Sequence, residues 1–259
     1  MRMPEALRRA ATAAVCTMVL LGSATYATAA PVVLELFTSQ GCSSCPPADA
    51  LLGDFVNRDG VIALSLPVDY WNYLGWEDTL AKHAHTERQR AYALARGDAE
   101  VYTPQLVVGG YLPAGGSDRA AIEAAILEAQ SQPQVSVAIA TYGTSVQIEV
   151  AAATAGGPTW GTVWVVLYDS QETVAIARGE NAGRTVTYRN VVIDMHRLTM
   201  WRGEALRVEL PVAEMREAQA DGCVILIQEE RNGIPGPIVG AALYAAPIAA
   251  NTPLRAAPL

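Results

Sequence analysis

Cysteine is scarce in this sequence, with four residues in 259, and the chain also holds only three histidines. A secreted domain built on a disulfide framework needs more cysteines than this, so we exclude that class. The sequence also lacks a phosphate-binding glycine loop, a GxSxG nucleophile motif and an HExxH zinc motif. Enzymes that depend on these motifs are therefore not supported, and we expect no cofactor.

Positive charge is also in short supply. The chain carries 18 basic residues against 26 acidic ones, which gives a net charge of -8 at pH 7. The arginines are scattered along the chain and form no basic stripe. Because an acidic surface repels phosphate backbones, we expect no nucleic-acid partner.

Long apolar runs are absent except near the N-terminus. A basic start with Arg2, Arg8 and Arg9 precedes an apolar stretch over residues 10–22, and the small-residue run SATYATAA follows. This order predicts a signal peptide over residues 1–29, cleaved after Ala29. We therefore expect a secreted or periplasmic protein whose mature chain has no membrane span.

The mature chain changes its pattern near Gln132-Pro133. Before this point, apolar runs predict strands and periodic segments predict helices. The predicted strands cover 32–39 and 61–68, the helices cover 47–58, 80–96 and 117–131, and a hairpin over 104–116 turns at Gly109-Gly110. In the first helix we expect Ala50, Leu51 and Phe55 to face inward, and in the last we expect Ser117 as the N-cap. This alternation is typical of an α/β domain with a parallel core.

After Pro133 the chain has the pattern of an all-β domain. Predicted strands lie at 134–143, 144–154, 161–170, 184–193, 204–212 and 223–230, separated by Gly, Asn and Pro. Strands at this spacing indicate an antiparallel sandwich or a curved sheet. We therefore predict an α/β domain over 30–132, a β-rich, sandwich-like domain over 133–250 and a C-terminal tail over 251–259.

The stretch LFTSQGCSSCPP holds the only close pair of cysteines, Cys42 and Cys45, between a predicted strand and a predicted helix. A helix N-terminus stabilises a thiolate, so Cys42 at the exposed loop end is a candidate nucleophile and Cys45 its resolving partner. Pro46 and Pro47 suit the first helical turn. Two alternatives stay open for the pair: a structural disulfide, and a site for copper(I).

The segment VYTPQLVV places Thr103-Pro104 directly before a strand. Together with the CxxC pair, the Gly-Gly hairpin and the last helix, it makes residues 31–131 resemble the thioredoxin superfamily. The resemblance implies that Pro104 is cis, that Thr103 lies against Cys42, and that both receive the substrate backbone. It also implies a buried acid beneath the pair, for which Glu35 is the candidate, with a salt bridge or solvent as the alternative.

A second group of candidates follows the second predicted strand, in the segment PVDYWNYLGWEDT. Ligands of open parallel sheets meet the carboxyl ends of strands, so this segment is expected to converge with the CxxC loop. Asp69, Tyr70, Trp71 and Trp76 are therefore candidate substrate-binding residues. The alternative for each aromatic side chain is ordinary packing between helix and sheet.

The combined motifs VVLELFTSQGCSSCPPADALL, DYWNYLGW, HTERQRAYA and VYTPQLVV are similar to a bacterial secreted family known as domain of unknown function 1223. The resemblance extends over nearly all of the mature chain, through RNVVIDMHRLTMWRG and GPIVGAAL. It implies a thioredoxin-like domain followed by a β-rich domain.

The three histidines and Cys223 have less distinctive settings. His83 and His85 form an HxH on a predicted helix, where surface positions are favoured over a metal site, and His196 is expected to be structural. Cys223 opens the apolar run CVILIQ and is expected to be a small buried side chain, with transient pairing to Cys42 as the alternative.

Together these features predict a thiol–disulfide oxidoreductase that acts on protein thiols and disulfides, or on small-molecule thiols, or on a redox partner protein. The alternatives are a secreted binding protein with a structural CxxC disulfide and a copper(I) chaperone or sensor held by Cys42 and Cys45.

Overall fold

The computed structural model describes residues 30–245, so the predicted signal peptide and C-terminal tail lie outside the described residues. The strands are β1 (Val32–Thr38), β2 (Val61–Pro67), β3 (Gln105–Val108), β4 (Leu112–Gly115), β5 (Val137–Tyr142), β6 (Ser145–Val150), β7 (Gly161–Ala175), β8 (Thr185–Trp201), β9 (Leu206–Pro211), β10 (Gly222–Arg231) and β11 (Ile234–Ala245). The helices are α1 (Pro46–Phe55), α2 (His83–Arg96), α3 (Arg119–Gln130) and α4 (Val212–Glu217), with a 3₁₀ turn η1 (Asn72–Leu74).

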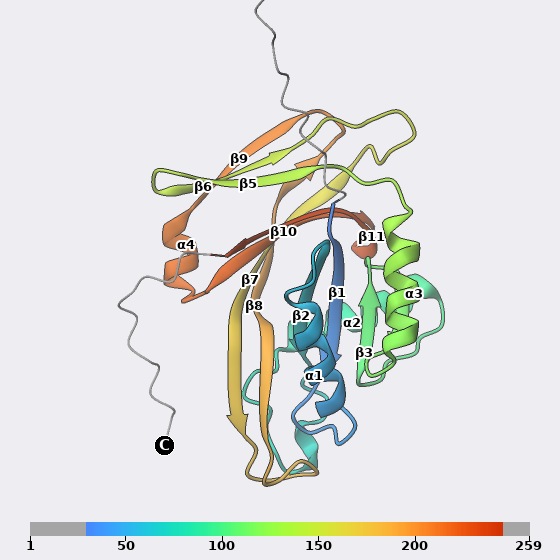
Figure 1. The fold of residues 1–259 in the computed structure, drawn as a ribbon, viewed down its shortest axis with the longest axis vertical. Helices are drawn as coiled ribbons and strands as arrows, with labels where there is room; N and C mark the ends of the chain where they lie inside the picture. Colours follow the sequence, from blue (N-terminus) through green and yellow to red (C-terminus); the bar gives the residue numbers. More distant parts are fainter. Residues whose placement is uncertain (1–29, 246–259) are drawn as a thin grey trace, which may run out of the picture.

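These strands form two sheets (Figure 1). The larger sheet has eight strands in the order β11-β10-β7-β8-β2-β1-β3-β4, and the smaller has three in the order β5-β6-β9. The protein is therefore an α/β structure with a large mixed sheet and a second, antiparallel sheet. The predicted boundary at Gln132-Pro133 falls between α3 and β5.

The large sheet joins strands from both halves of the chain. β8 lies beside β2 in parallel, with Ser65 opposite Val191, and the Asn190 amide donates to the Ala63 carbonyl oxygen at 2.9 Å. The expectation of a parallel core holds only for β1–β2 and β2–β8, because the other pairs are antiparallel. β7, β8, β10 and β11 extend the first sheet, and β5, β6 and β9 form the second.

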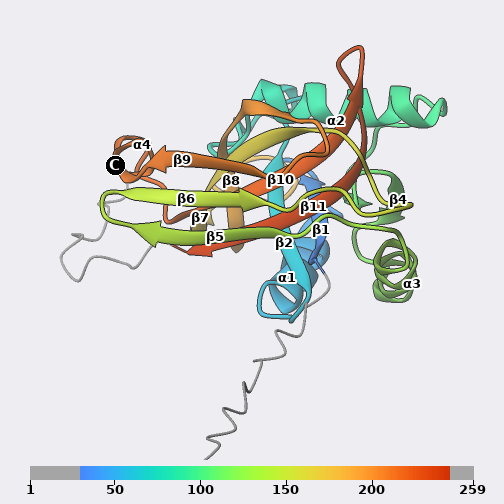
Figure 2. The same ribbon diagram turned by 90° about the horizontal axis from the view of Figure 1, so that it is seen from above.

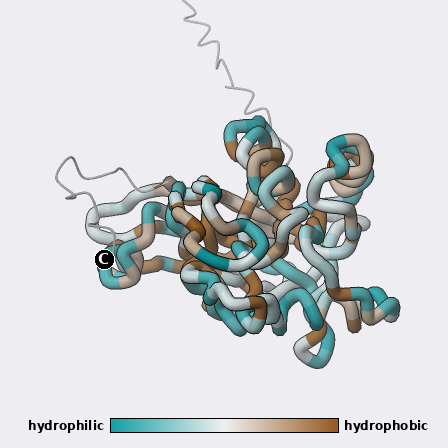
Figure 3. The backbone as a smooth tube through the Cα atoms, turned by 90° about the horizontal axis from the view of Figure 1, so that it is seen from below, coloured by the Kyte–Doolittle hydropathy of each residue, from teal (hydrophilic) through white to brown (hydrophobic). Residues whose placement is uncertain are grey.

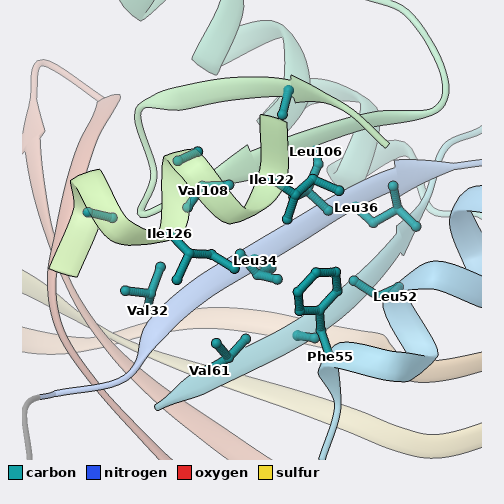
Figure 4. Packing of buried hydrophobic residues seen from close by; sticks show 14 of the residues in the cluster. Val32, Leu34, Leu36, Leu52, Phe55, Val61, Leu106, Val108, Ile122 and Ile126 are labelled. Carbon is teal, nitrogen blue, oxygen red and sulfur yellow. The ribbon is translucent and has the colours of Figure 1, made fainter. Parts of the chain in front are cut away.

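One face of the large sheet packs against α1 and α3. Alternate side chains of β1, Leu34 and Leu36, contact this layer because successive residues of a strand point to opposite faces. Figure 4 shows Phe55 and Leu52 of α1 approaching the same strand. The predicted inward face of α1 is wrong in part, since Ala50 is exposed and Leu51 half-buried. Ala48, Asp49, Leu52 and Phe55 are the buried residues of this helix.

The opposite face of the sheet is covered by α2, as the view from above shows (Figure 2). Val33 and Phe37, the other alternate positions of β1, pack there with Tyr92 of α2. Phe37 and Tyr92 meet edge to face with ring centroids 6.2 Å apart. Both faces of β1 and β2 are therefore buried, which explains their largely apolar sequences.

The three-stranded sheet packs on the part of the large sheet built from β7 and β10. Val146 and Ile148 of β6 contact a layer that contains Val165 and Ile225. In Figure 3 the apolar, brown parts of the chain are concentrated in the interior, while many loops are teal. Apolar and polar residues alternate along β5, β6 and β9 because this sheet has one buried and one exposed face.

All predicted strands and helices are present, with shifted ends. The prediction omitted α4 and β11, and the N-cap of α3 is Asp118 rather than Ser117. The Asp118 carboxylate accepts a hydrogen bond from the Ala121 N–H at 3.0 Å, which satisfies a free donor of the first turn. Across residues 30–245, no helix has both the length and the apolar character that a membrane crossing requires.

Candidate functional site

Cys42 and Cys45 form a disulfide in the loop between β1 and α1, with their Cα atoms 5.4 Å apart. Cys45 is the N-cap residue of α1, and its carbonyl oxygen accepts hydrogen bonds from the Ala48 and Asp49 N–H groups at 2.8 and 3.0 Å. Proline occupies the first turn of the helix, as predicted. The pair therefore lies at the positive end of a helix dipole.

The expectation that Cys42 is exposed is wrong, because its exposed fraction is 3% and that of Cys45 is 0%. Trp71 covers the loop so closely that a Cβ added at Gly41 would lie 3.1 Å from the Trp71 Cβ. The two intervening serines do face solvent, and the Ser44 hydroxyl lies 3.4 Å from the Cys42 sulfur.

Thr103-Pro104 is a cis peptide bond, as the resemblance implied. Gly116 separates Pro104 from α1: a Cβ on this glycine would lie 2.8 Å from the Pro104 Cβ and 3.0 Å from the Ala48 Cβ. The Gly116 N–H donates to the Pro104 carbonyl oxygen at 3.0 Å. Because Ala48 is three residues beyond Cys45, the proline lies beside the helix that carries the disulfide.

An open groove of about 580 Å³ runs along this proline. Its lining residues are Tyr102, Pro104, Gly115, Gly116, Ser117, Asp118 and Arg119. Tyr102 is 39% exposed and Tyr73, in the 3₁₀ turn, is 78% exposed. Exposed aromatic side chains are therefore present at the groove and in the segment that follows β2.

Two of the predicted aromatic residues contact the loops of the site. The Trp71 Nε1–H donates to the Thr103 hydroxyl at 2.8 Å, and its ring stacks on Tyr73 with centroids 6.5 Å apart. The Trp76 Nε1–H donates to the Gln40 side-chain oxygen at 2.8 Å. The segment after β2 thus converges with the CxxC loop, as predicted from its place in the chain, and it also contacts the Thr103-Pro104 loop.

The other two predicted residues of this segment, Asp69 and Tyr70, contact α2. The Asp69 carboxylate pairs with the His83 ring at 2.9 Å and accepts a hydrogen bond from the Thr86 hydroxyl. The Tyr70 hydroxyl donates to the Gln89 side chain at 3.2 Å. These contacts anchor the segment to α2, and the role of Asp69 and Tyr70 in substrate binding stays a prediction.

Glu35 has the salt bridge that was the alternative to a proton-transfer role. Its carboxylate accepts hydrogen bonds from the Arg88 Nε at 2.6 Å and from the Tyr92 hydroxyl at 2.5 Å. Arg88 also donates to Gln228 of β10 at 3.0 Å. Glu35 therefore points toward α2, on the face of β1 opposite to that of Leu34, Leu36 and α1.

Asp49 is a buried acid on the helix of the pair that the sequence interpretation missed. Its carboxyl is 3% exposed and accepts a hydrogen bond from the Thr38 hydroxyl at 2.7 Å. Burial raises the pKa of Asp49 to about 7, and the nearby charge of Asp78 adds to the effect. Residues four apart on a helix lie on one face, so Asp49 lies one turn beyond Cys45. An acid at this spacing from the second cysteine is the signal that could have identified it.

Asn181 was also missed, and it comes from the turn between β7 and β8. Its side-chain amide donates to the carbonyl oxygens of Gln40 and Cys42 at 2.9 and 2.8 Å. The Gln40 N–H in turn donates to the Asp78 carboxylate at 2.7 Å. A single Asn in a turn carries no sequence signal for such a contact, because Asn is common in turns for local reasons.

The remaining candidates lie in structural settings. The expected surface position is wrong for His85, which is buried with its Nδ1 2.8 Å from the Pro67 carbonyl oxygen, and burial lowers its pKa to about 4. His196 pairs with Asp194 and Glu214, both at 2.9 Å. Cys223 is free and buried, which confirms the packing interpretation. Within residues 30–245, no three His, Cys, Asp or Glu side chains form a group that could hold a metal ion.

The sequence also matches the profile of a protein family. The sequence profile of the family described as protein of unknown function (DUF1223) matches residues 33–228, which include the CxxC loop, the cis-proline loop and the β7–β8 turn. The chain belongs to the DUF1223 family. The family resemblance inferred from the sequence motifs is thereby confirmed.

Two solved structures are similar to this member of the family. The crystal structure of protein AGR_C_4864 from Agrobacterium tumefaciens has 34% sequence identity and a TM-score of 0.75, over 88% of this chain and 99% of that chain. The structure of HBP35 of Porphyromonas gingivalis has 14% identity and a TM-score of 0.56, over 88% of this chain and 80% of that chain. The second likeness concerns the fold alone. No curated protein matches the sequence.

Proposed function

We propose that this protein is a secreted or periplasmic thiol–disulfide oxidoreductase, with a thioredoxin-like N-terminal domain and a β-rich, sandwich-like C-terminal domain. One observation carries the proposal: a CxxC disulfide at the N-terminus of α1 lies beside the cis-proline loop, with Gly116 between Pro104 and Ala48. A helix N-terminus stabilises the thiolate that disulfide exchange requires. The partners would be protein thiols and disulfides, small-molecule thiols or a redox protein.

The proposed reaction begins when a substrate thiolate attacks the Cys42 sulfur of the disulfide. The sulfur–sulfur bond breaks, and its electron pair goes to the Cys45 sulfur, which takes a proton. A second substrate thiolate then attacks the substrate sulfur of the mixed disulfide and releases Cys42 as a thiolate. Two substrate thiolates and one proton thus give one substrate disulfide, one protein thiolate and one protein thiol.

Asp49 is the group that we assign to the proton on Cys45. With a pKa of about 7, its carboxyl is protonated below that pH and can donate, and ionised above it and can accept. Its second oxygen is buried without a hydrogen-bond partner. The Glu35 carboxylate is unsuited to this role, because Arg88 and Tyr92 already bind it.

The competing function is a binding protein in which the disulfide only holds the loop. The burial of Cys42 favours this alternative, since a substrate sulfur must reach that atom for exchange. The groove beside Pro104 and the exposed Tyr73 would then hold a partner polypeptide.

The test is the equilibrium between the Cys42–Cys45 disulfide and a graded glutathione buffer, measured in the Cys223→Ser variant by alkylation and intact mass. We expect a midpoint between about −120 and −270 mV, the range of exchanging redox proteins. A midpoint below about −300 mV would mark a structural disulfide and would make the binding protein the better description.

A further inference from the structure

The turn between β7 and β8 reaches the disulfide from the far half of the sequence. Figure 1 places this turn at the same end of the molecule as the loop between β1 and α1. The turn is closed by its own backbone, with hydrogen bonds from the Ile176 N–H to Arg184 at 2.9 Å and from the Gly183 N–H to Ile176 at 2.8 Å. Ile176 is buried against Val186, Tyr188 and Val191, which anchors the base of the turn.

Asn181 projects from this anchored turn into the CxxC loop. Two carbonyl oxygens lie within 2.9 Å of its side-chain nitrogen, so this atom must be the amide NH₂ group, which has two hydrogens to donate. The side chain is 1% exposed, and its oxygen is buried without a hydrogen-bond partner. The two donated bonds hold the side chain in this position although its buried oxygen has no partner, which is unfavourable.

The same loop is held from its other side through Gln40. The Gln40 N–H donates to Asp78, and its side-chain oxygen accepts from the Trp76 Nε1–H and the Thr79 N–H at 2.8 and 3.3 Å. Gln40 is itself 1% exposed. The CxxC loop is therefore fixed between the segment after β2 and the β7–β8 turn. Asn181 is the residue through which the β7–β8 turn contacts Cys42.

We infer that Asn181 is a positioning residue that stabilises the disulfide state of the pair, an inference that rests on the proposed function. The sulfur atoms of Cys42 and Cys45 must move apart when their bond is reduced, because non-bonded sulfurs cannot stay at a covalent distance. Asn181 ties the Cys42 carbonyl to the Gln40 carbonyl in the arrangement found with the bond intact. Its two hydrogen bonds therefore oppose the movement of the loop and favour the oxidised form.

The experiment compares Asn181→Ala with Asn190→Ala in the full chain, both in the Cys223→Ser background. Asn190 is a matched control, since it is also buried and donates its amide to a backbone carbonyl, that of Ala63, across β8 and β2. In graded glutathione, Asn181→Ala is expected to shift the equilibrium constant toward the dithiol by about three- to tenfold. Its disulfide should also be reduced faster by dithiothreitol, while Asn190→Ala loses stability and keeps the equilibrium of the parent.

Three results would overturn the inference: an Asn181→Ala equilibrium within twofold of the parent, a shift toward the disulfide, or an equal shift in Asn190→Ala. If Asn181→Ala does not fold, Asn181→Ser takes its place, because the serine hydroxyl keeps one donor. We then expect a shift of about threefold toward the dithiol, and the same three results would overturn the inference. The proposed function fails separately, through a parent midpoint in the range of structural disulfides, which leaves the comparison between variants unaffected.

Discussion

The Thr38 hydroxyl donates a 2.7 Å hydrogen bond to one oxygen of the Asp49 carboxyl, and the other oxygen is buried without a partner. The hydrogen bond from Thr38 lowers the pKa of this acid, but burial has the larger effect and raises the pKa to about 7. The folded protein therefore keeps the proton of Asp49 at pH values where the unfolded chain has lost it.

Asp49→Asn should remove a pH dependence of stability. Between about pH 4 and pH 7 the folded state binds the Asp49 proton and the unfolded state does not, so stability falls as pH rises through this range. The loss is about 4 kcal/mol for a pKa change of about three units. Urea unfolding at pH 4 and pH 8 should show that Asp49→Asn avoids this loss. Asp54→Asn changes an exposed acid of the same helix and is the control, which should lose as much stability between pH 4 and pH 8 as the parent. An equal loss in all three proteins would contradict the assignment of this pH dependence to Asp49.

The same substitution should alter exchange kinetics. If Asp49 exchanges a proton with Cys45, the rate at which the reduced protein resolves its mixed disulfide with a small thiol has a step near pH 7. Asp49→Asn should lack this step, and Asp54→Asn should retain it. Stopped-flow measurement from pH 5 to pH 9 distinguishes these profiles, and a step that survives in Asp49→Asn would assign it to another group.

Glu35→Gln should destabilise the fold without changing the redox chemistry. The substitution leaves Arg88 as a buried cation without its carboxylate, because the side-chain exposures of the pair are 10% and 1%. We expect a loss of about 3–5 kcal/mol in the free energy of unfolding. The glutathione equilibrium and its pH profile should stay those of the parent, so a changed profile would restore Glu35 as a candidate for proton transfer.

Two Gly→Ala substitutions near the pair should have opposite effects. At Gly116 the new Cβ would lie 2.8 Å from the Pro104 Cβ and 2.9 Å from the Leu36 Cδ1, so we expect a loss of about 1–3 kcal/mol. At Gly53, inside α1, the nearest atom is the Arg189 Cγ at 3.7 Å, and Ala should stabilise the helix by about 0.5–1 kcal/mol. Thermal and urea unfolding measure both. A tolerated Gly116→Ala would show that the proline loop does not depend on this close packing.

Cys223 should be inert in the folded protein. Its side chain is 0% exposed, and burial raises its pKa to about 12, so about one thiol in ten thousand is ionised at pH 8. After mild reduction, iodoacetamide should label Cys42 and leave Cys223 unlabelled until urea is added. Intact mass and peptide mapping report this, and native labelling of Cys223 would bring back its pairing with Cys42.

The sequence predicted the structure best where a motif or an apolar run is found in few structural settings. Largely apolar runs predicted β1 and β2, and the resemblance to the thioredoxin superfamily implied the cis bond before β3. The motif resemblance predicted the DUF1223 family, which the profile match confirms.

Side-chain partners across the fold were beyond prediction from the sequence. Strand periodicity says which residues face inward but not which strand lies alongside, so the position of β8 beside β2 was not foreseen. The contact of Asn181 with the CxxC loop follows from that position. Asp49 was missed because an acid in the first turn of a helix has an ordinary explanation in the helix dipole.

The pairing of β2 with β8 also has a consequence for the order of events on the ribosome. Asn190 and Ala63, which join these strands, are 127 positions apart in the chain. During synthesis the edge of β2 stays open until β8 has also been made, and open edges are prone to association with other chains. The contact between Asn181 and Cys42 spans 139 positions of the chain, so the final environment of the cysteine loop is assembled only after the β7–β8 turn has been made.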